Sequence, residues 1–398
     1  MSTATSSPVK RIVSVDAYRG MVILLMLGEL MRFRSVSRAF PDSAFWKFLA
    51  FHQTHVEWAG CALHDLIQPS FMFLVGLVLP FSLISRQASG ETRFQLYTHA
   101  ILRAVILIAL GIFLESLEVT QTNFTFHNTL TQIGLGYFPL FLLAQQGWKV
   151  QVGVFLVIMV GYWGLFAWYP APGPEFDWNA VDVPLDWRKL YQLGGFSAHW
   201  NKNSNVAWAF DVRWLNLFPR ETRFTHYTGG LCSLSCIPAV GTMLLGLLAG
   251  EWLRTRKTPV SKLAGIIFSA LLCLGVGFAL SHFDICPIVK GLWTPAWVFF
   301  SGGWCLVCLG CFYLVIEIGL YRAWAFPLIV IGSNPIVAFC SGYLLAGPIL
   351  AALYRHIGQR AFLIAGEAYS PLLEGATIVM MIWLIHFWLY RNKVFIRI

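Results

Sequence analysis

The stretch HVEWAGCALHDLIQPSFMFLVGLVLPFSLI, residues 55–84, decides what kind of fold this chain adopts. Its second half is apolar for long enough to form a helix that crosses the ~30 Å hydrocarbon core of a bilayer. Its first half gathers two histidines, two carboxylates and an indole at the mouth of that helix. Ionisable groups are costly to desolvate in such a place, so they indicate catalysis or transport more than packing.

The composition is that of a polytopic membrane protein. Of the 398 residues, 57% are hydrophobic and 12% are charged, and the mean hydropathy is +0.65. Soluble domains carry about 25% charged residues. Apolar stretches predict about ten transmembrane helices, which lie at 16–31, 63–84, 99–117, 131–145, 150–168, 232–252, 262–281, 296–319, 325–345 and 372–390.

The fold class that follows is all-α, a polytopic integral membrane helix bundle. We expect one domain, residues 1–398, with a long extracytoplasmic loop at 169–230. The mixed segment between Gly347 and Pro371 is expected to be interfacial or re-entrant.

Lys and Arg residues set the expected orientation, because basic residues concentrate in short cytoplasmic loops. The net charge is +9. With the termini inside, the inner segments carry 13 basic residues, among them Lys10, Arg11 and Arg397, against seven in the short outer segments. We therefore expect both termini to be cytoplasmic, with His55 and the 169–230 loop on the outer face.

The 169–230 loop combines aromatic rings with carboxylates. It contains Trp178, Trp187, Tyr191, Trp200, Trp208, Trp214 and Tyr227, interspersed with Asp177, Asp182, Asp186 and Asp211. Flat aromatic faces beside carboxylates suit a sugar, and a cationic amino sugar in particular. A belt of Trp and Tyr at the membrane interface is the alternative explanation.

His55 is the strongest catalytic candidate, because a neutral imidazole can take a proton from an amine or attack a thioester itself. Either role needs an orienting partner for the second ring nitrogen, and Glu57 and Asp65 are candidates. His64 adjoins Asp65, but neighbouring residues on a helix point in different directions. A loop histidine that is hydrogen-bonded to backbone is the alternative.

Further polar residues near the apolar stretches are candidate ligand contacts. Glu29, at the outer end of the first span, suits a substrate ammonium or interfacial water. Gln132 and Asn334 carry amides, which bind polar groups without the full cost of burying a charge. Asn334 precedes Pro335, and this order predicts a broken helix, a common device for ligand sites in membranes. Interhelical hydrogen bonding is the alternative for both amides.

The sequence contains no Walker-type phosphate loop, no GxSxG elbow and no HExxH zinc motif, and no metal cofactor is expected. A donor that bears phosphates would be bound by basic residues at the inner face. Arg86, Arg103 and Arg254 are candidates. The general excess of basic residues at that face is the alternative explanation.

Six ordered motifs resemble the heparan-α-glucosaminide N-acetyltransferase family and its bacterial relatives. The pattern H-x-x-W-x-G-x-x-x-x-D-L-x-x-P-x-F is met by His55, Trp58, Gly60, Asp65, Leu66, Pro69 and Phe71. The other motifs are SVDAYRG (14–20), LTQIGLGY (130–137), GGLCSLSCIPAVGTMLLGLLAG (229–250), PIVKGLWTPAWVF (287–299) and GSNPI (332–336). The run HWNKNSNVAWAFDVRWLNLFPR (199–220) resembles the bacterial branch.

The resemblance implies an acetyl-CoA-dependent N-acetyltransferase that moves an acetyl group from cytoplasmic acetyl-CoA to the amine of a glucosamine-type sugar at the outer face. His55 matches the catalytic histidine, with Asp65 as the residue that fixes its tautomer. The candidate contacts chosen from the residues themselves are Glu29, Trp58, Gln132, Asn334, Trp200 and Asn203 for the acceptor, and Arg86, Arg103 and Arg254 for the donor. The expected location is a bacterial inner membrane, and a homodimer is compatible with the resemblance.

Two other functions fit the same residues. One is an amino-sugar transporter, which would carry sugar across vesicles without acetyl-CoA. The other is a scaffold or sensor that keeps the fold without catalysis and binds no donor analogue.

Overall fold

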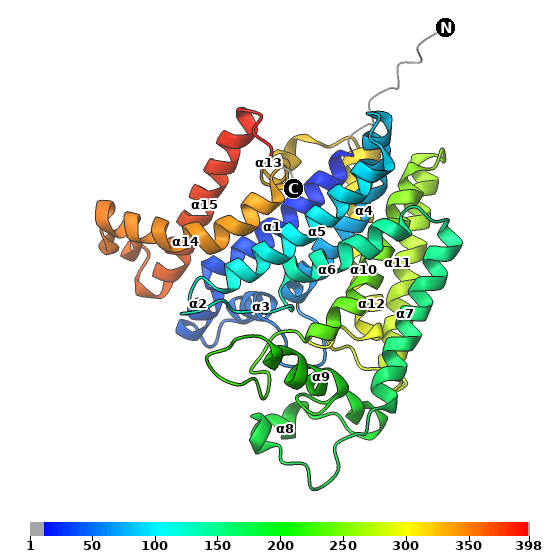
Figure 1. Cartoon of the computed structure of the whole chain (residues 1–398). Helices are drawn as coiled ribbons and strands as arrows, with labels where there is room; N and C mark the ends of the chain where they lie inside the picture. Colours follow the sequence, from blue (N-terminus) through cyan, green and yellow to red (C-terminus); the bar gives the residue numbers. More distant parts are fainter. Residues whose placement is uncertain (1–11, 397–398) are drawn as a thin grey trace. The chain divides into compact units, whose positions relative to one another are not determined.

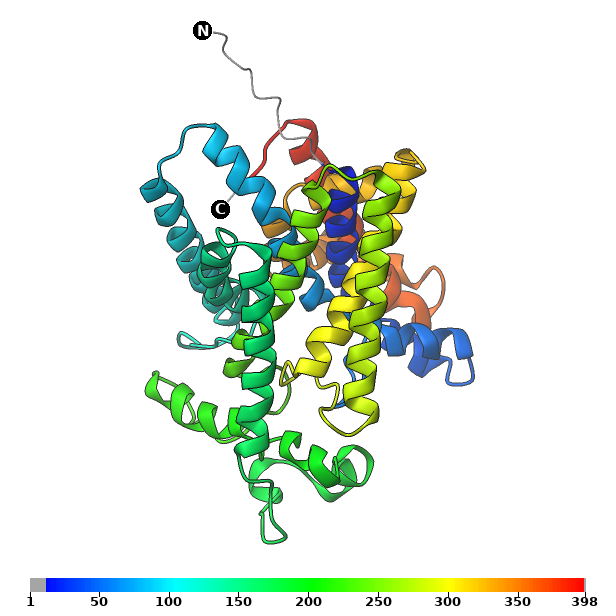
Figure 2. The same cartoon turned by 90° about the vertical axis from the view of Figure 1, so that its right-hand side faces the viewer.

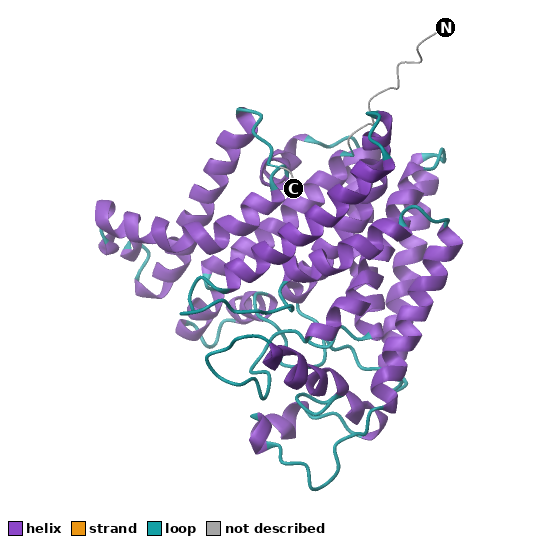
Figure 3. Cartoon of the chain, viewed as in Figure 1, coloured by secondary structure: helices purple, strands orange, loops and turns teal. Residues whose placement is uncertain are grey.

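The computed structural model describes residues 12–396. Lys10, Arg11 and Arg397, counted above for the inner face, lie outside the described residues. Between residues 12 and 396 the chain consists of helices joined by loops (Figure 3), and its extended pairing is one isolated bridge between Ala59 and Val289. The all-α prediction is confirmed.

Eight of the described helices are long and apolar enough to cross a membrane. The predicted integral membrane helix bundle is therefore confirmed. These helices are α4 (Ile67–Ala88), α5 (Arg93–Glu115), α7 (Trp148–Trp168), α10 (Cys236–Arg254), α11 (Pro259–His282), α12 (Pro295–Tyr313), α14 (Pro335–Ile357) and α15 (Ser370–Arg391), some lengthened by a short turn. Two shorter apolar segments are α6 (Thr129–Leu143) and Ala323–Gly332, which includes α13 (Phe326–Gly332).

The predicted span 325–345 is wrong in its limits. Helix α13 ends at Gly332, and α14 begins at Pro335 and continues to Ile357. The predicted break at Asn334 is confirmed, and Pro335 explains it, because proline lacks an N–H and is favoured in the first turn of a helix. The segment after Gly347, predicted to be interfacial or re-entrant, is helical to Ile357 and then forms two 3₁₀ turns.

The chain forms two compact units. Within the described residues, the first comprises Glu57–Gly60 and Gln68–Val307. The second comprises Ile12–Val56, Cys61–Ile67 and Cys308–Ile398, described to residue 396. The single domain predicted for residues 1–398 stays a prediction.

In the first unit, glycines bring the backbones of α4 and α10 into contact. A Cβ atom on Gly246 would lie 1.9 Å from the carbonyl oxygen of Phe73, and one on Gly250 would lie 2.3 Å from that of Leu77. The contacts advance in the same direction along both helices, so α4 and α10 are parallel and their C-terminal ends share one end of the unit. Small residues permit such close approach in membranes.

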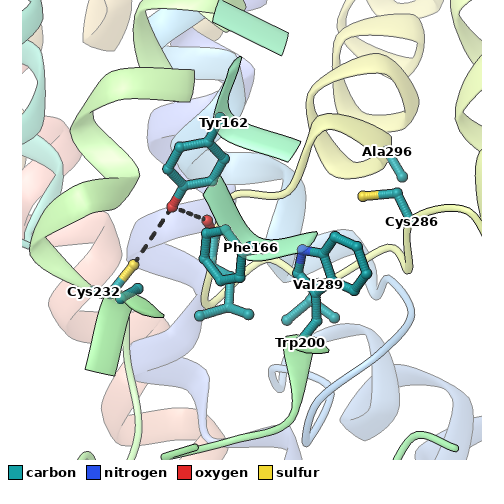
Figure 4. Close-up of a cluster of buried hydrophobic side chains, with 9 residues drawn as sticks. Tyr162, Phe166, Trp200, Cys232, Cys286, Val289 and Ala296 are labelled. Carbon is teal, nitrogen blue, oxygen red and sulfur yellow. Dashed lines mark hydrogen bonds between the residues drawn. The ribbon is translucent and has the colours of Figure 1, made fainter. Parts of the chain in front are cut away.

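The 169–230 loop carries α8 (Leu185–Tyr191) and α9 (Val206–Trp214) and lies at one end of α7 (Figures 1 and 2). Trp200 of this loop is fully buried and stacks on Phe166 of α7, with ring centroids 6.0 Å apart (Figure 4). In the same cluster Tyr162 donates a hydrogen bond of 2.9 Å to the carbonyl of Leu292. These contacts anchor the loop to the end of α7.

The second unit is built around α1 (Val13–Leu27). Gly20 of α1 meets the backbone of Leu328 in α13, where a Cβ atom would lie 1.9 Å from the carbonyl oxygen. After Leu27 the chain makes a 3₁₀ turn, η1 (Gly28–Met31), and then forms α2 (Phe33–Ala39) and α3 (Ala44–His52). The turn η1 therefore carries Glu29 at the end of α1.

We predict that Gly246→Val lowers the melting temperature of the detergent-purified protein. Overpacking costs about 1–3 kcal/mol, and the carbonyl of Phe73 cannot move aside as a side chain would. The matched control is Gly275→Val in α11, where nothing lies within 4 Å of the added Cβ atom. Equal melting temperatures for the two variants would contradict the packing described here.

Candidate functional site

His55 and Asp65 are in direct contact in the second unit. The Nδ1 atom of His55 lies 2.7 Å from Oδ1 of Asp65. Asp65 is fully buried on the 3₁₀ turn η2 (Leu63–Leu66), and its Oδ2 accepts hydrogen bonds from the N–H groups of Ala62 (2.9 Å) and Val56 (3.3 Å). An ionised carboxylate only accepts hydrogen bonds, so Nδ1 carries the proton and the neutral imidazole has its lone pair on Nε2.

This geometry distinguishes between the two carboxylates considered from the sequence. Asp65 is the partner at Nδ1, whereas Glu57 is exposed. The side chain of His55 is 57% exposed although its orientation is fixed. An imidazole that is oriented by a buried carboxylate and still accessible has the arrangement of a general base or a nucleophile. The catalytic role of both residues stays a prediction.

His64 lies beside His55, contrary to the expectation that it would point elsewhere. The two rings have centroids 4.7 Å apart. The Nε2 atom of His64 is 3.6 Å from Oε2 of Glu29, and the two side chains are 10% and 70% exposed. Sequence reasoning missed His64 because it assumed regular helix geometry for residues that form the short turn η2. Within the described residues, no group of three or more His, Cys, Asp or Glu side chains is placed to hold a metal ion.

Two residues of the α3 segment connect the turns that carry this site. Gln53 donates to the carbonyl of Gly28 at 2.5 Å and accepts from the N–H of Phe33 at 2.7 Å. It therefore spans the turn η1. His52 accepts a hydrogen bond of 3.2 Å from the N–H of Leu63, the first residue of η2. These bonds explain how Glu29 and His64, 35 positions apart in the sequence, come together.

The two candidate amides make hydrogen bonds within the protein. In the first unit, Gln132 is buried on α6, accepts from Gln68 of α4 at 3.1 Å and donates to the hydroxyl of Ser235. In the second unit, Asn334 donates to the carbonyl of Val394 at 3.0 Å and accepts from the N–H of Ile396 at 2.9 Å. Both sets of bonds fit the structural alternative, and substrate contact by either amide stays a prediction.

The other predicted acceptor contacts, Trp58, Trp200 and Asn203, hold the long loop together. The indole N–H of Trp58 donates to the carbonyl of Trp200 at 3.1 Å. Asn203 donates to the carbonyls of Val181 and Tyr227, both at 2.9 Å. Because Trp200 is fully buried, its ring presents no face to a ligand in this conformation. Acceptor binding by these residues stays a prediction.

The same loop contains a pocket of about 490 Å³ that sequence reasoning did not locate. Its lining includes Phe176, Asp177, Trp178, Asn179, Arg188 and Gln192. The guanidinium carbon of Arg188 lies 5.6 Å from the centre of the Trp178 ring, and its Nε is buried without a hydrogen-bond partner among the described residues. Aromatic rings together with amides and charged groups suit a polar, saccharide-like ligand.

The candidate donor arginines are not all placed together. Arg86 and Arg254 lie near the C-terminal ends of the parallel helices α4 and α10, and Arg86 pairs with Glu91 at 3.2 Å. Arg103 lies in the middle of α5, with its guanidinium carbon 4.6 Å from the centre of the Tyr137 ring. The structure thus brings Arg86 and Arg254 to one end of the first unit, whereas Arg103 lies within a span.

Asp211 is one of the loop carboxylates predicted to suit an amino sugar, and the structure shows that it is buried. It is fully buried on α9, and its Oδ2 accepts a hydrogen bond of 2.7 Å from the N–H of Ser233, just before α10. Burial raises the pKa of Asp211 from 3.8 to about 6, although the hydrogen bond from Ser233 and the charge of Arg220 act in the opposite direction. The sequence did not predict this burial, because no local pattern marks Asp211 as buried.

No family model matches the chain. The chain is similar to human heparan-alpha-glucosaminide N-acetyltransferase (Homo sapiens), with 20% identity over 432 residues, which cover 98% of this chain and 60% of the human protein. It is also similar to the mouse protein of the same name (Mus musculus), with 24% identity over 148 residues, or 36% of this chain and 20% of the mouse protein. The chain thus spans about 60% of the length of its human relative. This distant similarity over nearly the whole chain supports the resemblance to that family, and the bacterial branch stays a prediction.

We predict that Asp211→Asn raises the melting temperature above that of the wild type at pH 7.5, and that this difference is smaller at pH 5. Because the folded-state pKa lies above 3.8, the free energy of unfolding falls as pH rises from about 4 to about 6. The uncharged amide avoids this loss, which amounts to about 1–2 kcal/mol over this pH range. The measurement is the melting temperature in detergent at both pH values.

The matched control is Asp186→Asn, because the carboxylate of Asp186 is 95% exposed. It should leave the pH dependence unchanged. If Asp211→Asn follows the wild-type pH profile, the buried carboxylate does not titrate as described.

Proposed function

We propose that this integral membrane protein transfers an acetyl group from acetyl-CoA to the amine of a glucosamine-type sugar. The observation that carries the proposal is the 2.7 Å contact between His55 and the buried Asp65. The similarity to the human protein, whose name states an N-acetyltransferase activity, supports the reaction class. Acetyl-CoA enters here as a substrate that donates the acyl group.

The proposed chemistry uses Nε2 of His55. In the direct route, the amine nitrogen attacks the thioester carbonyl carbon, its proton passes to Nε2, and the same proton reaches the sulfur as the C–S bond breaks. In the two-step route, Nε2 attacks the carbonyl and releases the thiolate. The amine then takes the acetyl group from the imidazole, and the proton that its nitrogen loses passes to the thiolate. Asp65 stabilises the imidazolium that forms in either route, because its carboxylate faces Nδ1 at 2.7 Å.

We propose that the phosphates of the donor bind at the end of the first unit that carries Arg86 and Arg254. Guanidinium groups suit phosphate oxygens. Arg86 lies near the C-terminal end of α4, a helix that is long and apolar enough to cross a bilayer. We also propose that the protein lies in a bacterial inner membrane with both termini in the cytoplasm. This orientation fits a cytoplasmic acetyl donor and an external acceptor. A homodimer stays a prediction.

The acceptor sugar, in this proposal, binds the pocket of the long loop. Phe176 and Trp178 supply aromatic carbon, and Asp177, Asn179, Arg188 and Gln192 supply hydrogen-bonding groups for hydroxyls. The loop lies outside the candidate spans, where a sugar in water has access. The indole in the lining of this pocket is that of Trp178, which is 9% exposed, whereas Trp200 is fully buried.

We predict that His55→Ala lowers kcat for acetyl transfer by about 10²–10⁴-fold, the usual contribution of a general acid–base group. Asp65→Asn should also lower kcat, because an amide can present its N–H to Nδ1 and favour the wrong tautomer. The measurement is transfer of labelled acetyl from acetyl-CoA to glucosamine by the purified protein.

The control is His356→Ala on the exposed part of α14. Transfer that survives in His55→Ala would refute the proposed mechanism. An amino-sugar transporter, the alternative function, is indicated if vesicles take up the sugar without acetyl-CoA and no label is transferred.

We predict that Arg188→Ala and Gln192→Ala raise KM for the sugar acceptor severalfold and leave kcat nearly unchanged, because these side chains line the pocket without joining the chemistry. The matched control is Lys189→Ala, a neighbour on α8 whose ammonium pairs with Asp186 at 3.4 Å. An unchanged KM in both pocket variants would place the acceptor elsewhere.

A further inference from the structure

The mechanism above leaves one histidine of the site without a function. His64 is largely buried, and its ring centroid lies 4.7 Å from that of His55. On its other side, Nε2 of His64 lies 3.6 Å from the exposed carboxylate of Glu29. The second unit therefore contains two ionisable groups that lead from the neighbourhood of His55 to an exposed carboxylate.

Acetylation of an amine requires two acidic hydrogens to leave the nitrogen. An α-amino group has a pKa of about 7.7–8.0 and an alkylamine about 10.4, so the acceptor arrives mainly as an ammonium. One proton must leave before the lone pair can attack the carbonyl carbon. A second leaves when the C–N bond has formed, and the thiolate takes up one proton. The reaction therefore releases one proton to water.

His55 can account for only one of these transfers. Its Nδ1 is committed to Asp65, so Nε2 alone exchanges protons with the reactants. That atom carries one proton from the nitrogen to the sulfur, or it carries the acetyl group. In either route a second proton acceptor with a path to water is required before the amine can attack.

We propose that His64, together with Glu29, removes the first proton from the acceptor ammonium and delivers it to water. This inference rests on the acetyl-transfer function proposed above. One ring nitrogen of His64 takes the proton as the ammonium N–H bond breaks and its electron pair becomes the lone pair of the amine. The proton on Nε2 then passes to Glu29 and from there to water. His64 is thus a second catalytic base, and Glu29 is a positioning residue that also discharges it.

The charged and titratable groups around His64 are consistent with this path. Asp65 follows His64 in η2, but its carboxylate is occupied by His55 and by two backbone N–H groups. His52 of α3 is bound to the N–H of Leu63. Arg32, which ends η1, lies 3.8 Å from Glu374. Glu29 is therefore the carboxylate placed against Nε2 of His64.

The test compares two acceptors with wild type, His64→Gln and Glu29→Gln. Glucosamine is largely protonated at pH 6.5, whereas an aromatic amine is uncharged at neutral pH and does not need the first base. The measured quantity is kcat/KM for labelled acetyl transfer from acetyl-CoA between pH 6.5 and pH 9. His356→Gln is the matched control, and melting temperatures show that the variants fold. Glu29 is 70% exposed, so its variant tests the inference even if His64→Gln does not fold.

We expect the variants to lose kcat/KM mainly for the protonated acceptor, glucosamine, and mainly at low pH. At pH 6.5 His64→Gln lowers kcat/KM for glucosamine by roughly 100-fold, and Glu29→Gln lowers it by a smaller factor. The loss shrinks towards pH 9, where the amine is already neutral, and it is small for the aromatic amine at every pH. His55→Gln loses activity with both acceptors at all pH values.

Two outcomes overturn the inference. If wild type is active and both variants lose nothing, or lose equally for both acceptors at every pH, His64 has a structural role or none, and the proposed function is unaffected. If wild type acetylates neither acceptor, the proposed function fails and this inference fails with it.

Discussion

The site depends on the burial of one carboxylate. Removing an ionised carboxylate from water costs several kcal/mol unless hydrogen bonds replace its hydration. Asp65 is satisfied by the N–H groups of Val56 and Ala62 and by the ring of His55. The chain between residues 55 and 66 must therefore fold back on itself to supply these donors. The same constraint that satisfies Asp65 fixes the tautomer and the orientation of the imidazole.

The apolar spans are held together by close packing and paired amides rather than by buried charges. Within a membrane, helices associate through close backbone packing and through amides that are paired. Gly246 and Gly250 bring α10 against α4, and the linked amides of Gln68 and Gln132 join α4 to α6. A neutral amide chain places polar atoms in the bundle without the cost of a buried charge. Among the candidate site residues, Glu29 and Asp65 lie on turns and Arg86 and Arg254 lie near helix ends, whereas Arg103 lies in the middle of α5.

The sequence predicted most of the fold because hydropathy over about 20 residues is a local property. It also predicted the break at Asn334, since proline acts on its immediate neighbours. It did not predict that α14 continues to Ile357, nor that His64 faces His55, nor that Trp200 is buried whereas Trp178 lines a pocket. These features depend on how a turn or loop packs against distant residues, and no local pattern encodes that.

The two carboxylates of the site differ greatly in how much of their side chains is exposed. The side chain of Asp65 is 1% exposed, His64 10%, His55 57% and Glu29 70%. A carboxylate shielded from water interacts strongly with its imidazole and holds it in place, because screening is weak there. A carboxylate in contact with water exchanges protons readily and has little power to orient a partner. Asp65 and Glu29 therefore suit opposite tasks, orientation of one histidine and discharge of the other, and the proposed acetyl transfer would use both.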